Sequence, residues 1–255
     1  MANSLENKVA IVTGGAGGIG QVYARALAEE GAAIVIADLN AAGAQAAAEK
    51  LTKDGYKAIG VAVDVTDIDS AKAMVEAAKA AFGGVDILVN NAGIMSTLPK
   101  GKITELPVAE YERAIHINAS SMLVCTQAAL PAMRERGGGT IINQSSTAAF
   151  ETGGLYRLSK NAVVALTATL AHELGREHFT VNAIAPGMIQ TEEGFRSAGT
   201  PDSERRQARA AGVPNYWPDR PPEALVGALM LLASPAGDYI NGQTLIVDGG
   251  RNVRL

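Results

Sequence analysis

The sequence predicts an α/β fold, a doubly wound parallel sheet of about seven strands flanked by helices and forming a single domain. Short apolar runs that end in Gly, Asp or Asn alternate with alanine-rich helical stretches along the 255 residues. A strand that reads as one continuous apolar run is buried on both faces, which requires a helical layer on each side. Repeated β-then-α order gives parallel strands joined by right-handed crossovers. The chain shows no internal repeat or low-complexity linker, so one domain is expected.

Seven runs qualify as strands, and the stretch after the first shows the helical period. Apolar residues recur there at i, i+3, i+4, i+7 and i+8: Ile19, Val22, Tyr23, Ala26 and Leu27. Residues 190–222 depart from the alternation, with charges, glycines and PNYWPDRPP, and are predicted to be a substrate-site insertion or lid. The strand candidates are KVAIVTG (8–14), AAIVIAD (32–38), KAIGVAVDV (57–65), VDILVNNAG (85–93), GTIINQS (139–145), FTVNAIAPG (179–187) and GQTLIVDGG (242–250).

Composition excludes several classes of function. Hydrophobic residues make up 47% and charged residues 19%, enough for a large core, and the net charge of −4 gives no general attraction to nucleic acid or membranes. No apolar run approaches the ~20 residues of a membrane span, and no basic-then-apolar leader is seen, so a cytoplasmic protein is expected. The single cysteine, Cys125, excludes an internal disulfide, and the three scattered histidines do not form a metal site.

The first strand runs directly into TGGAGGIG (13–20) and then into the amphipathic helix. Glycines there let the backbone turn sharply and approach a pyrophosphate held at the helix N-terminus, as in a Rossmann-type dinucleotide site. Two registers fit: Gly15, Gly17 and Gly20 match G-x-G-x-x-G, whereas Gly14, Gly18 and Gly20 match T-G-x-x-x-G-x-G. Strand, loop and helix occur in the order that such a site requires.

Asp38 ends the second strand, eighteen residues after Gly20. A carboxylate about 20 residues beyond the loop can accept hydrogen bonds from the adenosine ribose, and it repels a 2′-phosphate. Leu39 and Asn40 follow and provide no cation for that phosphate. Asp38 therefore favours NAD over NADP, although an aspartate in this position can also be a helix N-cap.

The stretch SSTAAFETGGLYRLSK (145–160) contains a candidate proton-transfer pair. In a helix that begins near Leu155, Tyr156 and Lys160 lie one turn apart on the same side. A free phenol has a pKa of about 10, and a fixed ammonium beside it lowers that pKa. Tyr156 is then a plausible acid/base for alcohol–carbonyl exchange, with a serine at the end of the preceding strand holding the substrate oxygen.

Together these motifs resemble those of the short-chain dehydrogenase/reductase family, in family order and over nearly the whole chain. The resemblance implies an NAD-dependent alcohol dehydrogenase or carbonyl reductase. The motifs that carry it are TGGAGGIG (13–20), Asp64-Val65, NNAG (90–93), HIN (116–118), QSS (144–146), YRLSK (156–160) and APGMIQT (185–191).

The resemblance also implies a role for each site residue. Asn118, Ser146, Tyr156 and Lys160 would be the catalytic set, in which the Asn118 carbonyl holds a water that links Lys160 to solvent. Lys160 would also bind the nicotinamide ribose. The remaining cofactor contacts would be Gly14, Gly17, Gly18, Ile19 and Gly20 at the phosphates, Asp38 at the ribose, Asp64, Val65 and Asn91 on the adenosine side, and Ile189 and Thr191 at the carboxamide.

One departure from the family pattern affects the serine. Only ten positions separate Ser146 from Tyr156, fewer than in many relatives, so TAAFETGG is shortened. Ser146 aligns with the family role, but Ser145 would point inward instead if the strand end shifted, because neighbouring strand residues face opposite ways. Glu192 and Glu193, in the predicted lid, are interpreted as solvated charges.

The helix after Tyr156 is apolar almost all round, which indicates burial against another subunit. The resemblance to the family implies that this subunit belongs to a homotetramer. Two rival functions stay open. One is an NADPH-dependent reductase of the 3-oxoacyl-thioester type, and the other is a non-catalytic protein that binds NAD and regulates. The substrate, its stereochemistry and the physiological direction are not indicated by the sequence.

Overall fold

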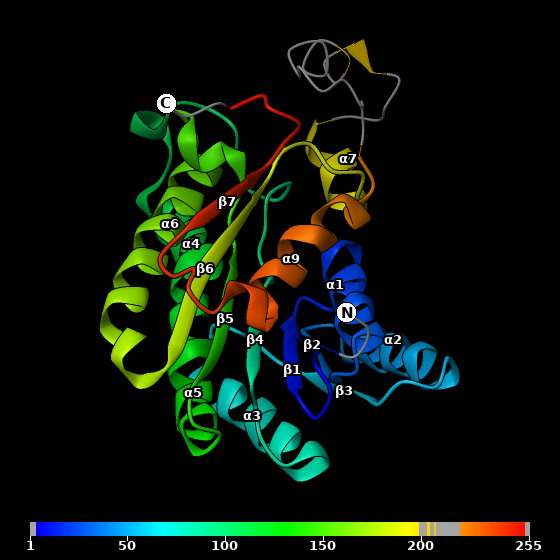
Figure 1. Cartoon of the computed structure of the whole chain (residues 1–255). Helices are drawn as coiled ribbons and strands as arrows, with labels where there is room; N and C mark the ends of the chain where they lie inside the picture. Colours follow the sequence, from blue (N-terminus) through cyan, green and yellow to red (C-terminus); the bar gives the residue numbers. More distant parts are fainter. Residues whose placement is uncertain (1–3, 199–202, 205–206, 208–219, 253–255) are drawn as a thin grey trace.

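The computed structural model describes residues 4–198, 203, 204, 207 and 220–252. Its centre is a seven-stranded parallel sheet of order β3-β2-β1-β4-β5-β6-β7, which confirms the predicted fold class (Figure 1). Each predicted strand is present and is shorter than its apolar run. The strands are β1 (Val9–Thr13), β2 (Ala33–Asp38), β3 (Ala58–Ala62), β4 (Ile87–Asn90), β5 (Gly139–Gln144), β6 (Phe179–Pro186) and β7 (Thr244–Val247).

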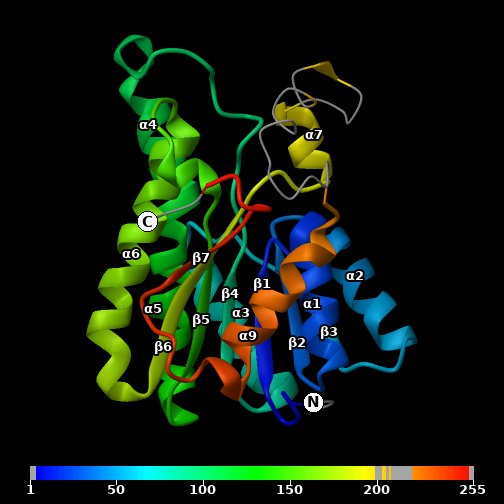
Figure 2. The same cartoon turned by 45° about the horizontal axis from the view of Figure 1, so that its top comes forward.

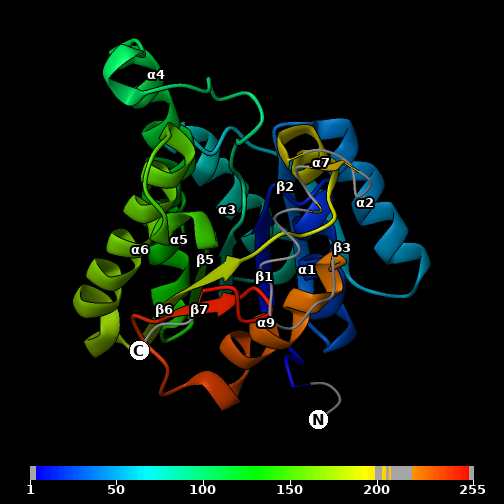
Figure 3. The same cartoon turned by 90° about the horizontal axis from the view of Figure 1, so that it is seen from above.

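Helices cover both faces of the sheet (Figures 1 and 3). One layer contains α1 (Gly18–Glu29), α2 (Ala41–Lys53) and α9 (Val226–Ala233), and the other contains α3 (Ile68–Phe82), α5 (Ser121–Glu135) and α6 (Leu155–Leu174). The α4 helix (Val108–Ile115) packs against α6, while α7 (Glu192–Ala198) follows β6. The described residues also form short helical turns: Ile103–Glu105, His116–Ser120, Thr147–Phe150, Gly175–Glu177, Pro222–Leu225 and Pro235–Gly237.

The β1 strand shows why its residues are apolar on both sides. Ala10 and Val12 belong to the core beneath α1, α2 and α9, whereas Val9 and Ile11 belong to the core beneath α3, α5 and α6. Each strand side chain thus meets one of two helical layers, since successive residues point to opposite faces.

The order of the strands places a crevice at the carboxyl ends of β1 and β4. These two strands are neighbours, but the chain proceeds from β1 to β2 in one direction and from β4 to β5 in the other. At such a switch point the connecting loops part, and doubly wound proteins bind their ligands there. In Figure 2, α7 lies beyond these strand ends, near α1.

Of the predicted insertion or lid at 190–222, the structure describes residues 190–198, which include α7, then Ser203, Glu204 and Gln207, and finally residues 220–222. The remainder of that prediction lies outside the described residues. Within the described part of the chain, no helix has the length and apolar character to cross a membrane.

Candidate active site

The glycine loop between β1 and α1 lies at this crevice. Gly14 and Gly18 have φ angles of 63° and 54°, in the left-handed region that glycine tolerates best. A Cβ on Gly14 would lie 2.9 Å from the Ala92 Cα, and a Cβ on Gly20 would overlap the Gly14 carbonyl oxygen. Gly17, by contrast, has an extended φ of −161° and open space around its Cβ position. The structure therefore favours the register of Gly14, Gly18 and Gly20.

The N-terminus of α1 is suited to an anion. Its N-cap is Gly17, which has no side chain to bond the first N–H groups, and its first turn contains no acidic residue. Backbone N–H groups and the positive end of the helix dipole are therefore available to a phosphate. The loop and this helix end fit the pyrophosphate of a dinucleotide. Ile19, partly buried, packs onto the core below the loop.

Asp38 connects the end of β2 to the glycine loop. Its two carboxylate oxygens accept hydrogen bonds from the backbone N–H groups of Ala16 (3.0 Å) and Asn40 (2.9 Å). Asn40 is the N-cap of α2 and accepts a hydrogen bond from Gly43 N (3.0 Å), so Asp38 is not the helix cap. Asp38 is half-buried at the crevice, followed by Leu39, which is 77% exposed.

Three further candidate residues lie shortly after strands: Asp64 and Val65 after β3, and Asn91 after β4. The Asp64 carboxylate accepts hydrogen bonds from the N–H (2.9 Å) and hydroxyl (2.7 Å) of Thr66, which lower the pKa of Asp64. Val65 packs against the core beneath α3 and α5. Asn91 donates hydrogen bonds to the carbonyls of Thr13 (2.9 Å) and Gly14 (3.1 Å) and so fixes the loop from the β4 side.

The proton-transfer pair lies at the start of α6, after two glycines with positive φ, Gly153 and Gly154. The Ser146 side chain acts on the Tyr156 hydroxyl and lowers its pKa, while the Ser146 Oγ also accepts a hydrogen bond from Ala148 N (3.2 Å). Ser145 is buried, and its hydroxyl donates to the Lys160 carbonyl (3.0 Å) instead. Of the two serines, Ser146 therefore faces the tyrosine.

Lys160 and Tyr156 have displaced pKa values, both mainly because of burial. The Lys160 ammonium lies 5.9 Å from the centre of the Tyr156 ring and donates to the Gln144 carbonyl (2.8 Å). Burial lowers the pKa of Lys160 to about 8 and raises that of Tyr156 to about 12, although Ser146 opposes the rise. The pKa lowering that the sequence led us to expect for Tyr156 is therefore absent here, because desolvation of the phenol dominates.

Asn118 occupies a turn of π-helix, His116–Ser120, between α4 and α5. It is fully buried, and its side chain accepts from Ile94 N (2.7 Å) and donates to Ile94 O (2.9 Å) and to the Ser159 hydroxyl (3.0 Å). Gly93 packs closely beside it: a Cβ there would lie 2.9 Å from the Asn118 Oδ1, so the Asn118 side chain would have to shift. Such π turns are frequent at functional sites, and no local sequence pattern announced this one.

Ile189 and Thr191 lead the chain from β6 to α7. Ile189 is buried and pairs with Arg220 in an isolated parallel bridge. Thr191 accepts a hydrogen bond from Gly194 N (3.0 Å) at the start of α7. The Thr191 methyl lies 3.7 Å from the Cβ position of Gly18. The segment thus comes close to the glycine loop.

The sequence assigned no polar role to Thr13, Tyr23 or Gln144, which form hydrogen bonds near the site. The Thr13 hydroxyl accepts from the N–H groups of Asn91 (3.0 Å) and Ala92 (3.1 Å). The Tyr23 hydroxyl donates to the Gln144 side chain (3.0 Å) in the interior. Tyr23 was predicted only as one of the apolar residues of α1, and a tyrosine in such a row is the signal that a buried polar partner exists.

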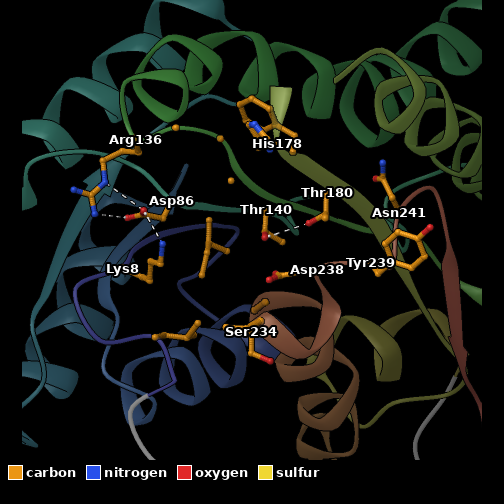
Figure 4. Close-up of a pocket in the computed structure, with 18 of the residues that line it drawn as sticks. Lys8, Asp86, Arg136, Thr140, His178, Thr180, Ser234, Asp238, Tyr239 and Asn241 are labelled. Carbon is orange, nitrogen blue, oxygen red and sulfur yellow. Dashed lines mark hydrogen bonds and ion pairs between the residues drawn. The ribbon is translucent and has the colours of Figure 1, made fainter. Parts of the chain in front are cut away.

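A second hollow, of about 770 Å³, lies at the opposite, amino-terminal ends of the strands (Figure 4). Three of its charged side chains contact one another: Lys8 (3.4 Å) and Arg136 (3.1 Å) both pair with Asp86. Thr140 and Thr180 also bond to each other (3.2 Å). The hollow is separate from the Tyr156 site. Among the described residues, no cluster of His, Cys, Asp or Glu could hold a metal ion.

Comparison with known proteins agrees with this geometry. Residues 14–252 match the family model described as enoyl-(acyl carrier protein) reductase. An uncharacterised oxidoreductase of Mycobacterium tuberculosis is 46% identical over 249 residues, covering 98% of this chain and 99% of the relative. D-threitol dehydrogenase of Mycolicibacterium smegmatis is 38% identical over 256 residues, covering 98% and 95%.

A solved structure of 7α-hydroxysteroid dehydrogenase, in complex with NADH and 7-oxoglycochenodeoxycholic acid, superposes with a TM-score of 0.90. It is 34% identical to this chain, and the match covers 97% of this chain and 96% of that one. With its fold, its ordered motifs and these relatives, the chain belongs to the short-chain dehydrogenase/reductase family.

Proposed function

We propose that this protein is an NAD-dependent alcohol dehydrogenase or carbonyl reductase, in which Tyr156 is the acid/base. As a family member it is an oxidoreductase that transfers a hydride between a nicotinamide cofactor and an alcohol or ketone. The observation that carries the site assignment is the convergence of Ser146 and Lys160 on Tyr156: the Lys160 ammonium lies 5.9 Å from the centre of the ring, and Ser146 lowers the pKa of the hydroxyl.

Each residue then has a chemical task at the substrate oxygen. Ser146 holds that oxygen by a hydrogen bond, and Tyr156 exchanges a proton with it. A Tyr156 pKa of about 12 keeps the phenol protonated, as donation to a carbonyl oxygen requires. In the opposite direction, the nearby Lys160 charge stabilises the phenolate that accepts the alcohol proton. When bound, the nicotinamide supplies or takes up the hydride.

Asn118 supports this set by fixing Ile94 next to it, through both the N–H and the carbonyl of Ile94. We assign the pyrophosphate to Gly14, Gly17, Gly18, Ile19 and Gly20, the adenosine to Asp38, Asp64, Val65 and Asn91, and the nicotinamide side to Ile189 and Thr191 together with Tyr156 and Lys160. We also infer a cytoplasmic homotetramer, in which residues 190–222 border the substrate.

The preference for NAD rests on Asp38. Its carboxylate is already fixed by Ala16 N and Asn40 N at the end of β2, so it cannot readily turn away from a phosphate placed on the ribose. We expect turnover with NAD to exceed that with NADP by at least about tenfold at equal concentration. Faster turnover with NADP would instead favour the reductase of the 3-oxoacyl-thioester type.

The central experiment is Tyr156→Phe, assayed over a panel of secondary alcohols, cyclic diols, sugars and hydroxysteroids. General acid/base catalysis contributes at least about 100-fold, so turnover should fall by that factor or more. NADH binding, followed by fluorescence, should stay within about twofold, because the phenyl ring is retained. Unchanged turnover excludes the mechanism, and tight NADH binding by a wild-type protein that oxidises no alcohol would favour the regulatory alternative.

A further inference from the structure

The loop after β4 is held by side chains from two other elements. Three successive backbone N–H groups donate to side-chain oxygens: Ile94 to Asn118 (2.7 Å), and Met95 (3.0 Å) and Ser96 (2.6 Å) to one oxygen of Glu193. The Ser96 hydroxyl donates to the second Glu193 oxygen (2.8 Å). Glu193 is thus not the solvated charge that the sequence suggested.

Through its position in the chain, Glu193 links the loop after β4 to a segment that lies near the glycine loop. It lies in the first turn of α7, two residues after Thr191, whose methyl lies near Gly18 of the glycine loop. Gly18 follows β1, whereas Met95 and Ser96 follow β4, the neighbouring strand. The segment Thr191–Glu193 therefore reaches from one side of the β1/β4 crevice to the other.

The neighbouring glutamate makes no comparable contact. The Glu192 side chain is 87% exposed and pairs with Arg196 of the same helix (2.9 Å), whose side chain is 65% exposed. Pairs of this kind contribute little to stability. The charge of Glu193 also contributes to raising the pKa of Tyr156, after the larger effect of burial.

We propose that Glu193 is a positioning residue whose carboxylate latches α7 to the Met95–Ser96 backbone and so holds the Thr191–Glu193 segment across the cofactor crevice. The effect on the cofactor rests on the proposed function. The loop after β4 is also bonded to Asn118 through Ile94. This loop therefore connects the Thr191–Glu193 segment with Asn118 of the catalytic set.

The latch itself can be tested without a cofactor, by hydrogen exchange of the wild-type protein and its variants. Glu193→Ala removes every acceptor from Met95 N and Ser96 N, so exchange of these two amides should quicken at least about tenfold. Glu193→Gln keeps an oxygen acceptor and an NH₂ group that can donate to the Ser96 hydroxyl, so exchange should stay near the wild-type rate. Glu192→Ala, the matched control, should leave both amides unchanged.

NADH titration then tests the consequence. Glu193→Ala should weaken binding about fivefold to tenfold, while Glu193→Gln and Glu192→Ala stay within about twofold. Ser96→Ala should have a smaller effect, and adding it to Glu193→Ala should change little more, since both remove the same contact.

Two results would overturn the proposal: amides 95 and 96 that exchange alike in wild type and Glu193→Ala, or faster exchange with unaltered NADH affinity. A wild-type protein that does not bind NADH would refute the proposed function instead. The exchange measurement would still report on the latch.

Discussion

Lys160 combines a functional position with an energetic cost. It is 4% exposed, and its ammonium is bonded to the Gln144 carbonyl in a site where burial lowers its pKa to about 8. A buried ammonium loses hydration that one carbonyl cannot fully replace. The protein therefore keeps a destabilising charge beside Tyr156, as active sites commonly do.

Lys160→Met should stabilise the cofactor-free protein while abolishing turnover. The pKa of Lys160 falls from 10.5 to about 8 on folding, so between these values the unfolded chain binds the extra proton. The wild-type penalty is fully present below about pH 8 and diminishes as the pH rises toward 10.5. Urea unfolding near pH 7 should show a gain of about 1–3 kcal/mol, which shrinks at higher pH. A less stable variant near pH 7 would mean that the bond to Gln144 outweighs the burial cost.

The choice between Ser145 and Ser146 could be predicted only in part from the residues themselves. Alternation along β5 implied that one serine faces the site and the other the interior, and family order favoured Ser146. The facing direction depends on where β5 ends relative to α6. In the structure the Ser145 hydroxyl donates to the Lys160 carbonyl, whereas Ser146 is the serine that acts on Tyr156.

At the scale of elements, the junction of β1 and α1 was the most predictable part of the site. A strand, a glycine loop and an amphipathic helix follow one another within a few residues, so local sequence contains all of the required information. The register of the glycines was not local. It depends on Ala92 and Asn91, which arrive from β4.

Gly20→Ala and Gly17→Ala should differ sharply in stability. The Gly20 Cβ would overlap the Gly14 carbonyl oxygen, so the loop must move, at a cost of about 1–3 kcal/mol. No described atom lies within 4 Å of a Cβ on Gly17, and its φ is extended, so the change should be within about 0.5 kcal/mol. Denaturant unfolding of both cofactor-free variants measures the difference, and equal stabilities would contradict the packing of this loop.

Element boundaries were less predictable than element types. The run 57–65 was predicted as one strand, yet β3 ends at Ala62. Val63 is still buried and donates to the Asp38 carbonyl, but the chain then turns toward α3. Apolar character records burial, whereas the end of a strand is set by where its neighbour stops pairing.

At the scale of the whole molecule, the outer face of α6 is the surface on which the predicted contact with another subunit depends. Val163 and Leu170 of this helix are buried in this chain's own core. Ala165 and Ala168 are exposed, and Leu158 is 38% exposed. The small side chains of the two alanines would let a second helix approach closely, which favours the inferred homotetramer.

Native mass spectrometry should therefore detect four chains. Ala165→Glu places a charge on the outer face of α6 and should shift the mass toward smaller species. Ala46→Glu, on the exposed face of α2, is the matched control and should leave the mass unchanged. A monomeric wild type would refute the assembly and leave the catalytic assignment intact.

The sequence by itself determined the sheet, its helical layers, the glycine loop and the Tyr156–Lys160 pair, because each of these features depends on residues that lie close together along the chain. Tertiary structure decided what distant segments do to one another. It turned Asn118 inward on a π turn, raised the pKa of Tyr156 by burial, and brought Glu193 to the Met95–Ser96 backbone. Hydrogen bonds and desolvation act through space, so a charge that looks solvated in the sequence can be bonded across a crevice in the fold.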